Sequence, residues 1–600
     1  MEITTAERRT EKPVALDART MCEAFQKTAF AHPDRTALRT KGDEVSIGWG
    51  EYAERVRALA VGLAGLGVGK GDTVALMLTN RPEFHLADAA AMHVGATCFS
   101  IYNTYTPEQI EFLVTDADNR VVVTEQAFLD RLVPVMDGDN ALEHVVVVDG
   151  DAAEGTMTLD GLAERGDDGF DFEAAWRAVE PDDVLTLIYT SGTTGPPKGV
   201  QITHGNMTDT VRSYDEIIAF PDAGRVVSYL PMAHVAERNV SHYLPMMLGF
   251  TVTCCPNPRE VTKYLPEVRP TWFFAVPRIW EKLKAGLESM LDGLEDEEQQ
   301  KAIRAALEVS LERVRAIQAD EPVPDEVNRR WREADEQVLS GVREMLGLAD
   351  IESCNVGAAP TPPEVIEFFH ALGVPLAELW GMSETTGAGT CNPPDRIKIG
   401  TVGPPAPGIE VKLADDGEVL VKGPVVMSGY RNQPEKTKET FTDDGFLMTG
   451  DIGELDQDGY LTIVDRKKEL IINAAGKNMS PANIESKLKS AGPLIGQAIA
   501  IGDKRPYNVA LLTLDPDGIP SLGLGDSVEE LAENDEVLEK VQREVDAANE
   551  ELARVEQIKK FKLMPTEWEP GGDELTPTMK LKRKPIAEKY AAEIDALYSD

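Results

Sequence analysis

The sequence lacks the signatures of several protein classes. Six cysteines occur in 600 residues, and none lies in a CxxC or CxxH pattern, so no disulfide framework is predicted. No run of about 18 apolar residues is present; the best candidate, residues 243–255, is short and contains Pro245. The first 17 residues show no apolar stretch of the kind found in secretory signals. We expect a cytoplasmic protein with reduced thiols, no transmembrane segment and at most a peripheral membrane contact.

Positive charge is also scarce. Asp and Glu number 103 against 60 Lys and Arg, which gives a formal net charge of −43. Such a surface repels nucleic acid and anionic headgroups, so nucleic acid is not an expected partner. At roughly 1 M salt the Debye length is about 3 Å, and the self-repulsion of the chain is screened. We therefore hypothesise a salt-adapted, halophilic cytoplasm; an ordinary acidic protein is the alternative.

The order of apolar patterns indicates the fold class. Hydrophobic residues make up 42% of the chain, and its length suggests more than one structural unit. A helical pattern covers 51–66, and short continuous apolar runs suit strands buried on both faces. These runs lie at 72–78, 121–123, 145–148 and 184–188. The alternation predicts a mainly parallel α/β sheet.

Two later regions differ in character. A charged helical insertion is expected at about 285–347, with one apolar face formed by Ile303, Leu307, Leu311, Val314 and Ile317 and another by Trp331, Val338, Val342 and Met345. Short strands and turns follow from 408 to 465. After residue 465 the pattern predicts a small α+β unit, including one long charged helix from about 528 to 555.

A Gly/Ser/Thr-rich loop follows the buried strand at 184–188. Its backbone N–H groups, hydroxyls and lysine can wrap phosphate oxygens. The candidate ligands are Thr190, Ser191, Gly192, Thr193, Thr194, Gly195 and Lys198. The loop is not a Walker motif, because Pro197 precedes the lysine and Gly199 follows it. A flexible surface loop is the alternative interpretation.

Further motifs follow along the chain: GAAP at 357–360, WGMSET at 380–385, TGD at 449–451, DRKKE at 465–469 and PTMK at 577–580. Together with the loop, and in this order, they resemble the adenylate-forming superfamily of acyl-CoA synthetases, luciferases and peptide-synthetase adenylation domains. The resemblance implies an α/β fold of that type. A large N-terminal domain, 1–465, would bind ATP and the acyl group. A smaller, mobile α+β domain, 466–600, would turn on a hinge at Asp465 and carry the catalytic lysine.

The resemblance also implies a nucleotide site. Besides the loop, ATP or AMP would contact Gly357, Ala358, Ala359, Trp380, Gly381, Met382, Ser383, Asp451 and Arg466. Asp451 would accept hydrogen bonds from the ribose hydroxyls, and Arg466 would donate to ribose or phosphate. Trp380 would stack near the adenine; the family usually has tyrosine there, so a phenol hydroxyl is missing.

Catalysis is assigned on the same basis. Glu384 and Thr190 would hold the cofactor Mg²⁺, which bridges ATP phosphates. Lys580 would bridge the attacking carboxylate and the α-phosphate as the acyl-adenylate forms; the alternative is one more lysine in a solvated basic cluster at 580–584. CoA would then attack the adenylate after a rotation of the small domain. Gly476 would leave room for its pantetheine arm, and Lys468 is also assigned to CoA.

The CoA contact has one departure from the family pattern. Ile472 stands where many family members have a lysine, so one polar contact of the thioester step is missing. This residue is therefore a point at which the chain differs from the family it resembles.

Two segments bear on the acid. YLPMAHVAER at 229–238 and VPRIWEKL at 276–283 resemble segments of long-chain and bubblegum-type fatty-acyl-CoA synthetases. His234 would border the carboxylate, and Trp280 would gate a fatty-acid tunnel; a structural histidine and a core tryptophan are the alternatives. We predict a long-chain fatty acid:CoA ligase that uses ATP, a fatty acid and CoA. A homodimer is one option for its oligomeric state.

Three other functions stay open. The first is a related ligase acting on an aryl or branched acid, and the second is an adenylation enzyme that loads a carrier protein or stops at the adenylate. The third is a catalytically silent acyl or nucleotide binder. A requirement for free CoA separates the first two, and formation of AMP separates both from the third.

Overall fold

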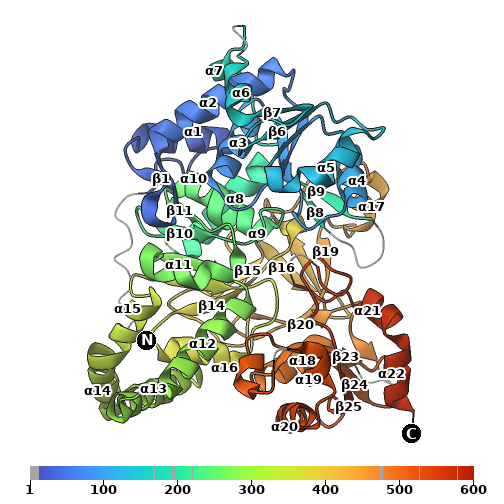
Figure 1. Ribbon diagram of the computed structural model, residues 1–600. Coiled ribbons are helices and arrows are strands. Elements are labelled where there is room, and N and C mark those ends of the chain that lie inside the picture. The colour runs from blue at the N-terminus through green and yellow to red at the C-terminus, as the bar shows by residue number, and fades with distance from the viewer. Residues whose placement is uncertain are drawn as a thin grey trace.

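The computed structural model describes residues 12–166, 169–190, 196–218, 220–472, 478–525, 527–576 and 579–599. The strand order of its largest sheet is β18 (Gly429–Tyr430), β9 (Lys198–Thr203), β8 (Val184–Thr190), β4 (Thr97–Ser100), β3 (Thr73–Met77), β5 (Val121–Thr124), β6 (His144–Val147) and β7 (Thr156–Thr158). Figure 1 shows this sheet in the upper part of the molecule. The strands expected near 72–78, 121–123, 145–148 and 184–188 are all present.

The central strands of this sheet are parallel, as the sequence predicted. β7, β6, β5, β3, β4 and β8 pair in parallel, whereas β9 pairs antiparallel with both β8 and β18. Leu76 packs in the same cluster as α2 (Trp49–Gly65) and α3 (Pro82–His93). Its neighbour Met77 packs on the other face with α4 (Pro107–Ala117) and α5 (Leu129–Met136). The continuous apolar runs are explained by this burial on both faces.

Smaller sheets continue the N-terminal part. One has the order β10 (Arg225–Ser228), β11 (Thr251–Cys254), β1 (Thr36–Thr40) and β2 (Ser46–Gly48). A second has the order β12 (Trp272–Ala275), β13 (Ser353–Val356), β14 (Leu376–Trp380) and β15 (Thr390–Cys391). A third, antiparallel, has the order β16 (Glu410–Leu413), β17 (Glu418–Lys422), β19 (Leu447–Leu455) and β20 (Leu461–Arg466).

The region 281–347 is helical, as expected. Its elements are α12 (Pro277–Asp292), α13 (Glu297–Gln318), α14 (Asp325–Ala334), a π-helical turn (Asp335–Leu339) and α15 (Ser340–Leu346). The π turn interrupts what the pattern predicts as a single second helix. Met345, assigned to an apolar face, is 45% exposed.

The C-terminal elements form a separate layered unit in Figure 1. Its sheet has the order β23 (Ile495–Ile501), β24 (Asn508–Leu514) and β25 (Ile558–Leu563), covered by α18 (Pro481–Ser490) and α20 (Asp535–Glu551). The single helix predicted for 528–555 is wrong. α19 (Val528–Ala532) ends early, and the side chain of Asn534 accepts from the N–H groups of Glu536 and Val537 to begin α20.

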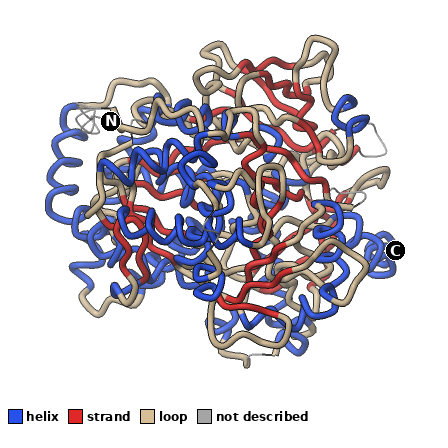
Figure 2. The backbone as a smooth tube through the Cα atoms, turned by 90° about the horizontal axis from the view of Figure 1, so that it is seen from above, coloured by secondary structure: helices blue, strands red, loops and turns tan. Residues whose placement is uncertain are grey.

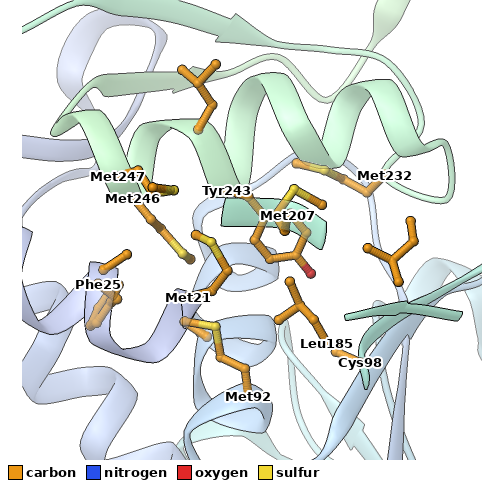
Figure 3. Close-up of a cluster of buried hydrophobic side chains, with 14 of the residues drawn as sticks. Met21, Phe25, Met92, Cys98, Leu185, Met207, Met232, Tyr243, Met246 and Met247 are labelled. Atoms are coloured by element: carbon orange, nitrogen blue, oxygen red, sulfur yellow. The ribbon is translucent and has the colours of Figure 1, made fainter. Parts of the chain in front are cut away.

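Methionine dominates one part of the N-terminal core. Figure 3 shows the buried side chains of Met21, Met92, Met207, Met232, Met246 and Met247 in one cluster with Phe25, Leu185 and Tyr243. They come from α1 (Met21–Ala31), α3, α8 (His204–Ile218), α10 (Leu244–Leu248), β8, the turn after β10 and the π-helical turn Asn239–Tyr243. The flexible thioethers fill the space between these differently oriented elements.

An ion pair is buried beneath this cluster. The side chains of Arg238 and Asp88 are 0% exposed, and the guanidinium also donates to the Ser100 Oγ at 3.1 Å. Asp88 Oδ1 lies 2.8 Å from His242 Nε2. Burial acts to raise the pKa of Asp88, but the charges of Arg238 and His242 outweigh it and hold that pKa below its usual value. The pair fixes α9 (Val235–Arg238) to α3.

All six cysteines are buried and free. In the described ranges, we find no helix with the length and apolar character needed to cross a membrane. The view from above in Figure 2 shows helices and strands mixed throughout the molecule. The expected α/β fold class is confirmed.

Candidate active site

A cavity of about 2110 Å³ lies between the N-terminal sheets and the C-terminal unit. Its walls include Thr190 at the carboxyl end of β8 and the residues that follow the carboxyl ends of β13 and β14. In α/β proteins this edge of a sheet is where ligands bind, because loops there converge around the strand ends. The cavity is therefore the candidate active site.

The Gly/Ser/Thr-rich loop connects two paired strands at this cavity. Thr190 at the end of β8 stands opposite Lys198 at the start of β9, and both line the cavity. Residues 191–195, which were assigned to phosphate, lie outside the described residues. The hairpin nevertheless fixes where the loop leaves and re-enters the sheet.

Glu384 is held by a tyrosine that the sequence analysis missed. Tyr430 donates its hydroxyl to Glu384 Oε1 at 2.8 Å, and the Lys198 ammonium lies 4.5 Å from the centre of the Tyr430 ring. Desolvation lowers the pKa of Lys198, while the negative charge of Glu384 opposes this. A buried carboxylate, a phenol and a lysine thus lie close together at the β8–β9 hairpin. The sequence gives no local signal for Tyr430, because this residue reaches the site only through the pairing of β18 with β9.

Asp451 has two donors at opposite ends of its carboxylate. The Trp380 indole N–H donates to Asp451 Oδ2 at 2.9 Å, and Arg466 Nε lies 2.8 Å from Oδ1. Gly389 allows this arrangement, because a Cβ there would lie 2.7 Å from the Trp380 ring. Desolvation raises the pKa of Asp451, and Arg466 opposes the rise. The tryptophan that departs from the family pattern therefore orients a carboxylate.

Lys580 projects into the same cavity from the C-terminal unit. Desolvation, and next the positive charge of Arg466, lower the pKa of Lys580, whereas Asp451 and Glu384 act to raise it. Lys580 lines the same cavity as Asp451 and Glu384 of the N-terminal part. The described domain arrangement thus brings Lys580 together with the residues assigned to ATP.

His234 also lines the cavity, at the start of α9. Its Nδ1 accepts from the N–H of Ala236 at 3.2 Å. Burial, with a smaller effect of Lys580, lowers the pKa of His234 to about 3, so the ring is neutral at pH 7. Next to it, Glu237 accepts from the N–H groups of Tyr229 and Leu230 at 3.0 and 3.1 Å and fixes that wall.

The remaining nucleotide candidates also line the cavity: Gly357, Ala358, Ala359, Gly381, Met382 and Ser383. Ala358 has φ +71°, a left-handed conformation that is rare for alanine. Strained backbone of this kind is found at ligand sites, where the surrounding structure stabilises it. The segment after β13 therefore has a backbone conformation of the kind found at ligand-binding sites.

The residues predicted to bind the acyl group and CoA do not all line the cavity. Trp280 is 0% exposed and packs against Phe273 and Phe369, with ring centroids 5.5 and 4.8 Å away. Among the described residues it belongs to the core and not to the cavity wall. Lys468 lines the cavity, Gly476 lies outside the described residues, and Ile472 is 46% exposed.

Ion pairs connect the two parts across the cavity mouth. Arg278 of α12 pairs with Asp515, which follows β24, and Lys282 Nζ lies 2.6 Å from Asp517. At the end of β20, Asp465 Oδ2 accepts from Ser480 Oγ at 2.5 Å and from the N–H of Ala482 at 3.1 Å. The segment assigned as a hinge is therefore bonded to the start of α18.

Family models match nearly the whole sequence. The model described as AMP-binding enzyme matches residues 25–431, and that of the AMP-binding enzyme C-terminal domain matches residues 468–600. The chain belongs to the adenylate-forming AMP-binding enzymes. The family resemblance drawn from the sequence motifs is confirmed.

This AMP-binding enzyme has named relatives. It is 50% identical over 452 residues to FadD11 of Mycobacterium tuberculosis, covering 74% of this chain and 79% of that protein. It is 35% identical over 581 residues to the long-chain-fatty-acid–CoA ligase FadD15 of Mycobacterium bovis, covering 92% of each. It is 31% identical over 626 residues to the long-chain-fatty-acid–CoA ligase ACSBG2 of Xenopus laevis, covering 97% of this chain and 84% of that protein.

Solved structures share the fold of this AMP-binding enzyme. The adenylation domain of a Mycobacterium chelonae carboxylate reductase superposes with a TM-score of 0.77 at 20% identity, covering 98% of this chain and 92% of that one. The anthranilate CoA ligase AuaEII superposes with a TM-score of 0.72 at 19% identity, covering 96% and 98%. At these identities the likeness concerns the fold, a large N-terminal AMP-binding part with a C-terminal domain.

Proposed function

We propose that this AMP-binding enzyme is a long-chain fatty acid:CoA ligase. The observation that carries the proposal is one cavity whose lining includes both charged groups and apolar side chains. Lys580, Glu384 and Asp451 are among the charged residues, and Leu230 and Phe274 are among the apolar ones. Such a cavity suits a molecule with a carboxylate head and a long apolar tail. The FadD15 and ACSBG2 names support the same substrate class.

The first half-reaction would form the acyl-adenylate. The fatty-acid carboxylate oxygen attacks the α-phosphorus of ATP, the bond to the β-phosphate oxygen breaks, and pyrophosphate leaves. The Lys580 ammonium would stabilise the charge that develops between carboxylate and phosphate. The Asp451 carboxylate, oriented by Trp380, would accept from the ribose hydroxyls.

Mg²⁺ fits the residues present. No group of three or more metal-binding side chains occurs in the described part of the chain, as expected for an ion that is held by one or two carboxylates and by substrate phosphates. Glu384 and Thr190 would hold it, with Glu384 oriented by Tyr430. When bound, the ion would spread the charge of the triphosphate.

The second half-reaction would transfer the acyl group to CoA. The thiolate attacks the acyl carbon, and AMP leaves with the bonding pair. We propose that residues 466–600 rotate about Asp465 between the steps, which withdraws Lys580 and admits the thiol along Gly476 and Lys468. His234, neutral and on the cavity wall, would border the reacting carboxylate.

Product analysis tests the proposed function. The protein is incubated with ATP, Mg²⁺ and straight-chain C2–C20 or aromatic acids, with and without CoA, at about 2 M KCl to screen its surface charge. We expect long-chain acyl-CoA and an equal amount of AMP, both dependent on CoA. Aryl thioesters alone would favour the related ligase, and adenylate without thioester would favour a carrier-loading enzyme. No AMP with any acid would favour a silent binder.

The same assay, repeated over a range of KCl concentrations, tests salt adaptation. We propose a halophilic, cytoplasmic enzyme because its net charge is −43 and its six cysteines are free. Activity should rise from low salt toward molar KCl as repulsion is screened. Full activity and folding at about 0.1 M KCl would contradict this proposal.

Trp380→Phe is expected to weaken ATP binding by about tenfold, because a hydrogen bond to a charged group contributes roughly 1.5 kcal/mol or more. The KM for ATP should rise, while the KM for the acid should change little. Discrimination between ATP and 2′-deoxyATP should also fall, since Asp451 loses its orienting donor. Steady-state kinetics with both nucleotides measure these changes.

Trp176→Phe is the matched control. The Trp176 indole also donates to a carboxylate, Glu173 Oε2 at 3.1 Å, but on α7 (Phe172–Arg177), away from the cavity. This variant should bind ATP as the wild type does. An unchanged KM for ATP in Trp380→Phe would contradict the positioning role of Trp380.

A further inference from the structure

The candidate cavity has an apolar arm that extends away from the nucleotide residues. The arm follows α12, whose apolar lining residues are Ile279, Leu283, Gly286, Leu287 and Met290. Arg278, Glu281 and Lys282 of the same helix also line the cavity, and Arg278 and Lys282 pair with acidic residues of the C-terminal unit. α11 (Val261–Val268) and α15 form its other sides. Figure 1 shows these three helices below the main sheet; α12 lies next to the C-terminal unit, with which its Arg278 and Lys282 form ion pairs.

Burial changes along this face of α12. Leu287 is 2% exposed and Leu283 is 8% exposed, whereas Met290 is 36% exposed. Met345, at the end of α15, also lines the arm and is 45% exposed. The arm thus opens to solvent between α12 and α15, at a rim that includes two methionines. The flexible, uncharged side chains of these two methionines suit contact with an apolar molecule.

Gly286 lies in the interior of α12, where glycine is less favourable than alanine. Packing does not require it. An added Cβ would have no described heavy atom within 4 Å beyond the helix's own backbone, whereas at Gly62 an added Cβ would lie 2.0 Å from the carbonyl oxygen of Leu162. Gly286 is itself exposed and lines the cavity, so a larger side chain at 286 would occupy the part of the arm that is open to solvent.

We propose that Gly286 keeps this arm open and determines the longest acyl chain that the enzyme accepts. The inference rests on the proposed function, because it assigns the arm to the distal methylene groups of the fatty acid. The occupant follows from continuity, since the arm and the residues around Lys580 belong to one cavity. From Ile279 to Gly286 the helix makes about two turns, roughly 10 Å, so only longer chains extend past Gly286.

The cause of the preference is the burial of methylene groups. Each buried CH₂ raises affinity about fourfold, so a side chain that excludes the end of a long acid removes several such gains. A short acid that ends before Gly286 loses none. The effect of a substitution should thus depend on chain length, which a general loss of folding or of ATP binding would not produce.

Gly286→Leu tests the inference. With C8, C12, C16 and C18 acids, kcat/KM for the two longest should fall by about tenfold or more, the equivalent of roughly two buried methylene groups. kcat/KM for the C8 acid should change less than about twofold, because no methylene group is excluded. Gly286→Ala should lie between this variant and the wild type. Activity on the C8 acid reports in the same experiment that the variant is folded.

Gly341→Leu is the matched control. Gly341 also lies in a helix, α15, and an added Cβ there meets no described atom within 4 Å, but it is not part of the described cavity lining. Its chain-length profile should equal that of the wild type. An unchanged ratio of C16 to C8 activity in Gly286→Leu overturns the role of Gly286 while the proposed function stands. A wild type that forms no thioester from any straight-chain acid overturns both.

Discussion

Replacement of Lys580 by alanine is expected to slow acyl-adenylate formation by about 10²–10³-fold, the usual effect of removing one group that stabilises developing charge. The ammonium lies in the cavity near Asp451 and Glu384, and desolvation lowers its pKa. Its positive charge would stabilise the negative charge that develops in the transition state. Release of pyrophosphate from ATP in the presence of a fatty acid measures this half-reaction.

The second half-reaction separates this role from a structural one. Synthetic acyl-AMP and CoA should give thioester at nearly the wild-type rate in the Lys580→Ala variant, because the ammonium is withdrawn before the thiol attacks. Lys584→Ala is the control for the basic cluster: its side chain is 64% exposed on α21 (Arg583–Lys589) and lies 3.8 Å from Glu588. An equal loss in both half-reactions for Lys580→Ala would contradict the proposed division of labour.

The sequence predicted those parts of the site that depend on local order. A buried apolar run followed by a Gly/Ser/Thr-rich loop predicted the end of β8, and pairing of Thr190 with Lys198 follows from the β8–β9 hairpin. The motifs at 380–385 and 449–451 lie at the end of β14 and in β19. Each of these placements depends on the few residues around the motif.

Contacts between distant segments were not predictable in the same way. Tyr430 reaches Glu384 only because β18 pairs with β9, and the Trp380–Asp451 bond depends on two sheets meeting. Trp280 is an example in which the local pattern does not determine the surroundings of a side chain. A helical pattern indicates that this residue faces inward, but it does not distinguish a protein core from a cavity, and the structure packs Trp280 against Phe273 and Phe369.

Arg238→Met is expected to lower the free energy of unfolding by about 3–5 kcal/mol, the usual cost of removing one partner of a buried ion pair. The substitution leaves the fully buried carboxylate of Asp88 without its cation. Urea unfolding at constant molar KCl measures the loss. A loss below about 1 kcal/mol would contradict the importance of the pair, since that is the range of exposed pairs.

The pH dependence of this loss identifies its cause. In the wild type the pKa of Asp88 is held low, so its contribution is present above the usual carboxyl pKa and is lost as the pH falls. In Arg238→Met the carboxylate is buried and unpaired, which raises its pKa, so stability is lost as the pH rises through that value. The difference between the two proteins should be largest at neutral pH and should shrink toward pH 4.

His242 strengthens the expected trend. Burial lowers its pKa, with Arg238 contributing to the decrease and Asp88 opposing it. Without Arg238, a protonated His242 can replace the missing cation as the pH falls. The double variant Arg238→Met, Asp88→Leu removes both charges and should recover much of the stability at every pH, because the cost lies in the unpaired charge and not in the lost pair. A loss that is independent of pH, or that the double variant does not reduce, would instead indicate that Arg238 acts through its packing volume.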